Sequence, residues 1–340
     1  MKNIARVFAI ATCCMLMFSC KETKRHITSS GKAGEVIVVI DRNIWEGPVG
    51  IALRDTLEAD CPFLPQREPL YTLVNITPNS FSNLFQVHRN IIMVHVDDSA
   101  VPGITTKYNV WAAPQCVINI EAMDLKSAIK MVNDNKELIV STLEQAERDR
   151  VINNAIKYEE TKVAPIVNNM AGGSPHFPIN YAVKKKTENF IWITSDTQFT
   201  QQGIFVYKYP YNGEKDAMSC ESIIKHRNQI LKDNVPGMFE NTYMTTSTFG
   251  TPSLEYIKYK DRHFAQVRGL WEVENDFMGG PFVSHSFYSQ DGRYIIVLEG
   301  FVYAPKYDKR EYLRQVEAII YSFEWENNSE KDQNILEERK

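Results

Sequence analysis

The segment GLWEVENDFMGGPF, residues 269–282, contains the side chains whose types and spacing come closest to a chemical site. Strand alternation places Trp271 on one face and the carboxylates of Glu272 and Glu274 on the other. Residues two apart on a strand are separated by about 6.5–7 Å. Two carboxylates at that distance can share a divalent cation or act as an acid and a base. The alternative is a solvated strand face without chemistry.

Two glycines and a proline follow these carboxylates, and they predict a special backbone turn. Its structural interpretation is a β-bulge or a hairpin corner. Its functional interpretation is a rigid loop that presents Met278 and Phe282 to a partner. The binding residues that this segment predicts are Trp271, Glu272, Glu274, Gly279, Gly280 and Phe282.

The rest of the chain contains no zinc-protease, P-loop, nucleophile-elbow or dinucleotide motif. His88 and His95 do not have metal-ligand spacing, and we expect both to be structural hydrogen-bonding groups. Ser174 and His176 lie two apart in a loop without an orienting acid, which does not make a triad. The sequence therefore predicts no catalytic residue, no metal site and no cofactor, and it favours a non-catalytic protein.

The proline-rich loop CPFLPQREP, residues 61–69, is a second candidate for recognition. Extended loops of this kind often bind ligands. They are as often connectors between elements, and both interpretations stay open at this point.

Cys20 ends the apolar segment at the start of the chain, where the sequence becomes polar at once. The uncharged run over residues 7–18 follows two basic residues, as in secretory signals, and is too short to span a bilayer core of about 30 Å. Its end, Met17-Phe18-Ser19-Cys20, resembles a bacterial lipobox, whose cysteine receives diacylglycerol. We predict a lipoprotein signal peptide over residues 1–19 and lipid attachment at Cys20. The alternative is an ordinary signal cleaved near Ser19.

A lipidated tether over residues 20–34 follows, with four basic residues and one acidic residue after the cysteine. Its basic residues either hold it against anionic head groups, at about 1 kcal/mol each, or belong to a solvated leash. Lys21 stands where inner-membrane lipoproteins typically carry aspartate. The sequence therefore favours the outer membrane and leaves the periplasmic or surface face undecided.

The mature chain would carry 36 basic and 42 acidic residues, a net charge of −6, which argues against nucleic acid as a partner. Its length of about 320 residues predicts two domains. Cys61, Cys116 and Cys220 remain after the signal and the anchor are removed. An odd number of cysteines allows no disulfide framework.

Hydrophobic periodicity predicts an α+β protein of two α/β sandwich-like domains. An N-terminal α/β domain is expected over residues 35–167, and a Gly- and Pro-rich linker over residues 168–178. The N-terminal elements expected are strands at 34–41, 69–76, 90–96 and 115–122, a helix from Pro48, and a helical stretch over 124–162 interrupted at 133–135.

The C-terminal α+β domain is expected over residues 179–325, as a curved antiparallel sheet with packed helices, followed by a polar tail at 326–340. Its elements would be strands at 189–194 and 203–211, a helix at 221–233, hairpins turning near Lys260-Asp261 and at Asp291-Gly292, and a last helix from Asp308. Glu311, three residues after Asp308, predicts a capping pair.

This element order, ending in YIIVLEGFVYAPKYDKREYLRQVEAIIYSF, looks like the PsbP/Mog1-type fold, a resemblance that implies fold alone. The mature chain also resembles a family of bacterial lipoproteins, the domain of unknown function DUF4837. The stretches that carry this resemblance are GEVIVVID…W, LPQREPLYTLVNITPNSF, HRNI and RGLWEVENDFMGGPF. It implies an address in the cell envelope and no particular reaction.

The sequence thus predicts a lipid-anchored cell-envelope protein at the outer membrane, acting as a non-catalytic binding or accessory subunit. Its expected partners are the membrane, through the N-terminal lipid, and another envelope protein. One alternative is a hydrolase of envelope glycans or polymers that uses an acidic pair such as Glu272 and Glu274. Another is a purely structural component of an outer-membrane complex, which would have a large exposed apolar patch instead of a cleft.

Replacing the predicted lipid acceptor tests this address. We expect Cys20→Ala to abolish incorporation of radiolabelled palmitate and to move the protein out of the membrane fraction. Cys220→Ala, which leaves the lipobox intact, should label and fractionate as the wild type does. Equal labelling of the Cys20→Ala protein would contradict the prediction.

Overall fold

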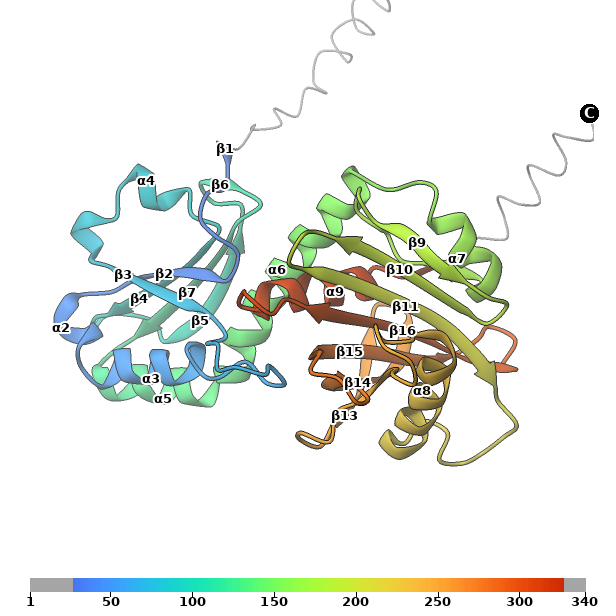
Figure 1. Ribbon diagram of the computed structural model, residues 1–340. Coiled ribbons are helices and arrows are strands. Elements are labelled where there is room, and N and C mark those ends of the chain that lie inside the picture. Colours follow the sequence, from blue (N-terminus) through green and yellow to red (C-terminus); the bar gives the residue numbers. More distant parts are fainter. Residues whose placement is uncertain (1–26, 327–340) are drawn as a thin grey trace, which may run out of the picture.

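The computed structural model describes residues 27–326, which form two domains joined by helix α6 (Figure 1). The predicted signal peptide, Cys20, the first part of the tether and nearly all of the polar tail lie outside the described residues. The tether expected over residues 20–34 is too long: residues 27–34 belong to the fold, where β1 pairs with β6 and Ser30 forms a bridge with His88. Within residues 27–326, no helix is long and apolar enough to cross a membrane.

A five-stranded mixed sheet forms the N-terminal domain, in the order β3-β2-β4-β7-β5. Its strands are β2 (Glu35–Val39), β3 (Thr72–Ile76), β4 (Asn90–Val96), β5 (Gly103–Tyr108) and β7 (Cys116–Ala122). Strands β3, β2, β4 and β7 are parallel, and β5 pairs antiparallel with β7. Both faces of the parallel part are covered, and for this reason the central strand β2 is a continuous apolar run after Glu35.

Helices α3 (Pro48–Leu57) and α5 (Leu125–Asp134) cover one face of this sheet (Figure 1). Helix α5 begins at a capping box in which Asp124 accepts from the Ser127 backbone N–H at 2.7 Å. The opposite face packs against the segment of η1 (Pro78–Ser80) and α4 (Asn83–Gln86) and against Trp111. The remaining short elements are β1 (Ile27–Thr28), α2 (Arg42–Trp45) and β6 (Ala112–Ala113).

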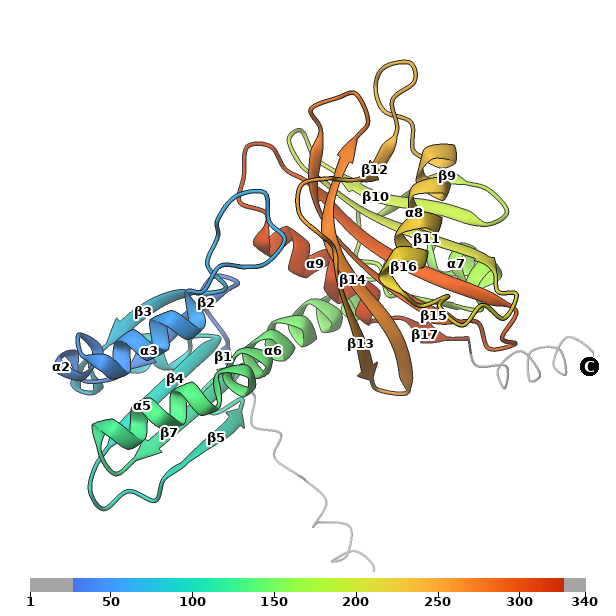
Figure 2. The ribbon, with the colours of Figure 1, turned by 90° about the horizontal axis from the view of Figure 1, so that it is seen from below.

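Helix α6 (Lys136–Lys157) belongs to both domains (Figure 2). Leu143 packs in the N-terminal core and Ile152 in the C-terminal core. The residues expected to form a linker, 168–178, are packed instead: they contain the end of α7 (Ala164–Ala171), strand β8 (Gly173–Ser174) and the fully buried Phe177. Strand β8 pairs with β17 (Glu324–Trp325). A continuous helix therefore connects the two domains.

The C-terminal domain is a curved antiparallel sheet, in the order β12-β14-β15-β16-β11-β10-β9, with β13 also paired to β14. Its strands are β9 (Ala182–Lys186), β10 (Phe190–Asp196), β11 (Gln201–Pro210), β12 (Met244–Thr246), β13 (Ser253–Tyr259), β14 (Arg262–Val273), β15 (Gly279–Tyr288) and β16 (Tyr294–Tyr303). Both predicted hairpins are confirmed, with positive φ at Lys260 and Gly292 in their turns.

Helices α7 and α9 (Arg310–Tyr321) pack on one face of this sheet and α8 (Cys220–Asn234) on the other (Figure 2). Each face is a separate apolar cluster, so the sheet is the middle layer of the domain. The predicted α+β class with a curved antiparallel sheet is confirmed. The likeness to the PsbP/Mog1 fold stays a prediction.

The prediction that Asp308 and Glu311 cap the start of helix α9 is wrong. The helix begins at Arg310, its N-cap residue is Lys309, and no side chain of its own caps it. Glu68 of the N-terminal domain accepts hydrogen bonds there from the backbone N–H groups of Lys309, at 2.7 Å, and Arg310, at 2.8 Å. A carboxylate suits this position because the first N–H groups of a helix lack intrahelical partners and carry partial positive charge. Glu68 in loop 61–69 thus braces one domain against the other (Figure 2).

Arg227 of α8 and Glu299 of β16 form an ion pair in the middle of the C-terminal domain. Both side chains are fully buried, and they are joined by two hydrogen bonds of 2.7 and 2.9 Å. Arg227 also donates to Thr246 Oγ1 at 2.9 Å and stacks 3.9 Å from the centre of the Phe282 ring. Through these contacts with β12, β15 and β16, Arg227 holds α8 against the sheet.

Breaking this pair leaves a buried charge uncompensated. We expect Arg227→Met to lower the free energy of unfolding by about 3–5 kcal/mol, and Arg227→Met/Glu299→Leu to recover much of the loss. Urea unfolding followed by tryptophan fluorescence measures both. Arg67→Met, which removes an exposed pair with Asp60, should change stability by less than about 1 kcal/mol. Similar losses for Arg67→Met and Arg227→Met would contradict the prediction.

Candidate functional site

A cleft with a volume of about 760 Å³ lies between the two domains. Helix α6 forms one wall with side chains at three- and four-residue spacing, which places them on one face. These are Glu137, Val140, Ser141, Glu144 and Arg148. The facing wall comes from α9, β13 and β14, and its polar members are Arg310, Arg314, Glu317, Glu255, Gln266 and Arg268. Loop 58–70 closes one side with Cys61, Pro62 and Leu70.

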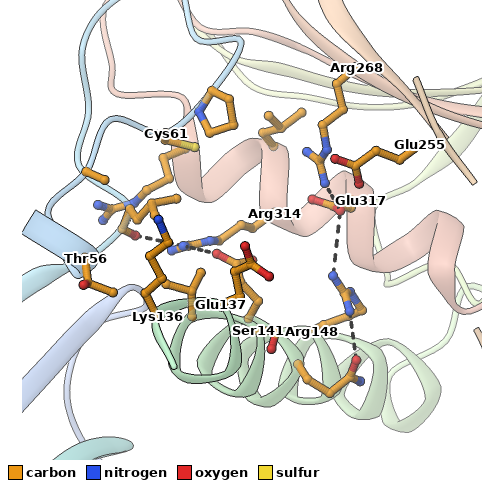
Figure 3. Close-up of a pocket in the computed structure, with 18 of the residues that line it drawn as sticks. Thr56, Cys61, Lys136, Glu137, Ser141, Arg148, Glu255, Arg268, Arg314 and Glu317 are labelled. Carbon is orange, nitrogen blue, oxygen red and sulfur yellow. Dashed lines mark hydrogen bonds and ion pairs between the residues drawn. The ribbon is translucent and has the colours of Figure 1, made fainter. Parts of the chain in front are cut away.

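Glu317 lies between Arg268 and Arg148 at the bottom of the cleft (Figure 3). Its carboxylate is hydrogen-bonded to Arg268 and is 3.8 Å from the Arg148 guanidinium, which stacks 3.9 Å from the centre of the Tyr321 ring. Burial alone would lower the pKa of Arg268, but the charge of Glu317 outweighs it and raises that pKa. Arg148, Arg268 and Glu317 therefore form a charged cluster whose side chains hold one another in place.

Arg314 and Glu144 make a second pair, which links α9 to α6 at 2.6 Å. Arg314 also donates to the Leu70 carbonyl at 2.8 Å, and the Tyr71 hydroxyl donates to Glu144 at 3.3 Å. Burial would lower the pKa of Arg314, yet Glu144 and its neighbours raise it. These contacts bind three segments that are distant in the sequence into one cleft wall.

In the described part of the chain, the charged side chains at the rim of the cleft are unpaired, unlike those at its bottom. Lys136, Glu137 and Glu255 are exposed, and within residues 27–326 none of their side chains has a hydrogen-bond or ion-pair partner. Four apolar side chains from four elements also line the cleft, and we call them together the apolar strip: Leu70, Val140, Ile257 and Leu313. The cleft thus offers an apolar surface bordered by both signs of charge.

Cys61 is the cysteine that lines this cleft, and its side chain is partly exposed. Burial, with a smaller opposing effect of Arg314, raises the pKa of its thiol to about 11. At neutral pH the group is a thiol, and the thiolate that a nucleophile requires is almost absent. The sequence named loop 61–69 as a candidate for recognition, and its residues Cys61 and Pro62 line the cleft. The cleft itself was not predicted, because its other walls come from distant segments.

His285 lies behind the cleft wall, under Gln266 and Tyr321. The Gln266 side-chain oxygen accepts from the Tyr321 hydroxyl at 3.1 Å and lies 3.3 Å from His285 Nε2. Burial, together with the nearby arginines, lowers the pKa of His285 well below its usual value. The imidazole is therefore neutral, and it fixes the orientation of the Gln266 amide.

The residues predicted from segment 269–282 lie elsewhere, at the other end of β14. Trp271 is 2% exposed, donates from Nε1 to the Val302 carbonyl at 3.2 Å, and packs in the same core as the fully buried Phe282. A side chain at Gly280 would meet the Val302 carbonyl oxygen at 2.0 Å, so the glycine allows β15 and β16 to approach. Gly279 begins β15 beside it.

Glu272 and Glu274 point away from that core, as strand alternation predicted. Glu272 accepts from Ser247 Oγ at 2.6 Å and from the Thr248 N–H at 3.4 Å, whereas Glu274 is exposed in the following turn. In the part of the chain from 27 to 326, no group of three or more His, Cys, Asp or Glu could hold a metal ion. Glu272 therefore has a local structural role in holding a loop.

Two of the histidines weighed in the sequence, His88 and His176, have structural partners. His95, for which the same role was expected, is exposed and has no side-chain hydrogen bond within residues 27–326. His88 lies 3.0 Å from Glu35 and 3.1 Å from the Asn90 carbonyl. His176 Nδ1 lies 2.8 Å from Glu159. The Ser174 hydroxyl donates to the Pro175 carbonyl, away from this imidazole. These contacts account for both histidines without a ligand.

The fold and the cleft define a two-domain α+β protein. Two family models match the chain, and the boundary between their matches falls at the end of α6. Residues 160–322 match the family model described as domain of unknown function DUF4837, and residues 29–155 match the domain of unknown function DUF8532. The predicted resemblance to DUF4837 is confirmed over residues 160–322 and not over the whole mature chain. The stretches GEVIVVID, LPQREPLYTLVNITPNSF and HRNI, which also carried it, lie in the DUF8532 match instead.

Two solved structures show weak similarity. One is a crystal structure from Bacteroides thetaiotaomicron, with 14% identity, a TM-score of 0.25 and coverage of 46% of each chain, so this chain spans less than half of its length. The other is the lipid transfer and protein localization domain of human StarD13, with 7% identity, a TM-score of 0.22, and coverage of 42% of this chain and 88% of that domain. No curated protein matches the sequence.

The raised pKa of Cys61 predicts slow alkylation. A shift from 9.0 to about 11 reduces the thiolate fraction at pH 7.5 about a hundredfold. We expect the iodoacetamide reaction at Cys61, measured by peptide mass spectrometry, to be slower by about that factor than at a model thiol of pKa 9. The rate should rise about tenfold per pH unit up to pH 10. Reaction at pH 7.5 as fast as the model thiol would contradict the prediction.

Proposed function

We propose that this protein is a lipid-anchored lipoprotein of the outer membrane that binds a ligand in the interdomain cleft and does not catalyse a reaction. The observation that carries the proposal is the cleft of about 760 Å³ between α6 and α9. Its volume is within the range of small-molecule sites, and it combines an apolar strip with a few polar groups. The ligand is expected to have an apolar body and polar groups of both signs.

The electrostatics of the cleft support binding over catalysis. Arg148, Arg268 and Arg314 are each paired with a glutamate, and the thiol of Cys61 is kept protonated by its raised pKa. A general acid or base needs a pKa near the working pH, and a nucleophile needs an activating neighbour. The paired guanidinium and carboxylate groups supply directional hydrogen bonds instead.

The envelope address rests on the N-terminal sequence, with Cys20 as the lipid acceptor and a basic tether after it. The first strand, β1, begins at Ile27, so only six residues separate the described fold from Cys20. At up to about 3.6 Å per residue, such a tether holds the fold within roughly 25 Å of the bilayer. A ligand-binding protein at this distance could serve an envelope protein as an accessory subunit.

No observation favours the alternative of a glycan hydrolase acting through Glu272 and Glu274. Glu272 is engaged by Ser247 and Thr248, and Glu274 is exposed in a turn. Neither residue lines the interdomain cleft.

Filling the cleft tests the proposal. Ser141→Trp places a large ring at an exposed position inside the cleft, and Asn153→Trp adds the same ring to an exposed position of α6 outside it. We would extract the full chain from native membranes in mild detergent and record native mass spectra. We expect a bound small molecule on the wild type and on Asn153→Trp, and at least about tenfold less on Ser141→Trp.

The two tryptophan variants should unfold within about 2 °C of each other, because each changes an exposed position. This comparison separates loss of binding from loss of folding. Equal occupancy in both variants would place the ligand outside the cleft and overturn the proposal, as would the absence of any bound molecule from the wild type.

A further inference from the structure

Three loops at one end of the C-terminal sheet carry large apolar side chains in solvent. We call them together the loop face: residues 236–243 before β12, residues 247–252 after it, and residues 274–278 between β14 and β15. Figure 2 shows loops around β12 and β14 projecting from the same end of this domain. The side chains of Met238, Phe239, Phe249 and Phe277 are between 63% and 106% exposed. Exposed apolar clusters mark interaction surfaces.

Hydrogen bonds hold these loops next to one another. The Glu274 N–H donates to the Tyr243 carbonyl and the Val273 N–H to the Met278 carbonyl, both at 2.9 Å. Ser247 Oγ donates to Glu272 at 2.6 Å and accepts from the Phe249 N–H at 3.0 Å. These hydrogen bonds hold the loops that carry the exposed apolar side chains in place. Glu272 in particular fixes the loop that carries Phe249.

A hollow of about 530 Å³ opens beside the loop face. The large side chains that line it are Trp192, Phe199, Met238, Trp271, Met278 and Tyr303. Aromatic residues and methionine are enriched in the cores of protein interfaces, and methionine adapts its shape to an inserted side chain. The hollow suits one large apolar anchor of a partner.

The charge on the loop face has one sign. Residues 236–252 and 274–278 include Glu240, Glu274 and Asp276 and no lysine or arginine. Among the described residues, the side chains of Glu240 and Glu274 have no partner. The hollow itself adds one charge of each sign, Lys184 and Asp196. The complement of this surface is therefore apolar and basic.

We propose that the loop face docks a partner protein through a segment with a large apolar side chain flanked by lysine or arginine. An anionic membrane surface would repel the three carboxylates beside the apolar tips. A second copy of this chain would bring like charges together. A partner segment of this kind places its apolar side chain in the hollow and its basic side chains beside the acidic loops. Binding at the loop face is independent of binding in the interdomain cleft.

The test uses a labelled amphipathic helical peptide of leucine and lysine with one tryptophan, and a matched peptide with glutamate in place of lysine. Fluorescence anisotropy with the full chain at about 50 mM salt measures binding. We expect the lysine peptide to bind and the glutamate peptide to bind at least tenfold more weakly. Phe249→Ser/Phe277→Ser should weaken binding of the lysine peptide about tenfold or more, as loss of central anchors does.

Glu240→Gln/Glu274→Gln should weaken binding about threefold to tenfold and reduce its dependence on salt. Leu84→Ser, which alters an exposed apolar side chain of the N-terminal domain, and Ser141→Trp in the cleft should leave it unchanged. All four variants change exposed positions only, so we expect each of them to fold as the wild type does.

Three results would overturn the proposal. The first is binding of the lysine peptide that does not depend on Phe249 and Phe277. The second is Phe-dependent binding of the Cys20→Ala chain to phosphatidylethanolamine and phosphatidylglycerol vesicles, which would assign the face to the membrane. The third is a dimer in sedimentation that Phe249→Ser/Phe277→Ser dissociates, which would assign it to a second copy.

Discussion

Charge pairing between α6 and α9 is the constraint on which the two-domain structure depends. Glu144 pairs with Arg314, and Arg148 approaches Glu317, with all four side chains largely withdrawn from water. Removing one partner of such a pair in the folded protein would leave a buried charge uncompensated, which costs far more than the loss of an exposed pair. Glu68 adds a further constraint by accepting from the first N–H groups of α9. The cleft walls are therefore held in one geometry.

This constraint determines how the cleft can bind. Helix α6 passes through both cores without a break, so the domains have no flexible hinge between Leu143 and Ile152. A cleft built on such a helix is preorganised, and a ligand does not have to order it on binding. At the bottom of the cleft, Glu317 is already paired with arginines. The carboxylates of Glu137 and Glu255 at the rim have no partner within residues 27–326 and can contact a ligand. We therefore expect ligand selectivity to depend on the rim.

Local patterns in the sequence predicted the elements well, because periodicity and turn chemistry act over a few residues. Strand β4 and the turn at Gly292 follow from apolar runs and from a two-residue turn signal. Strand β5 was missed because it is a largely exposed edge strand without an apolar face. The composition of residues 168–178 suggested a linker, yet tertiary packing buries them. The cleft could not be predicted, since Cys61, Arg148, Arg268 and Arg314 meet only after folding.

Strand β14 connects the two surfaces to which we assign binding. Its first part pairs with β13 and gives Gln266 and Arg268 to the cleft, and its last part pairs with β12 and carries Glu272 to the loop face. Arg268 and Glu272 are four residues apart, about 13 Å along the strand. Arg268 is neutralised by Glu317, whereas the side chains of Glu240 and Glu274 on the loop face have no hydrogen-bond or ion-pair partner among residues 27–326. On our two proposals, the cleft selects its ligand by shape and by the charges of its rim, and the loop face selects its partner by charge and apolar burial.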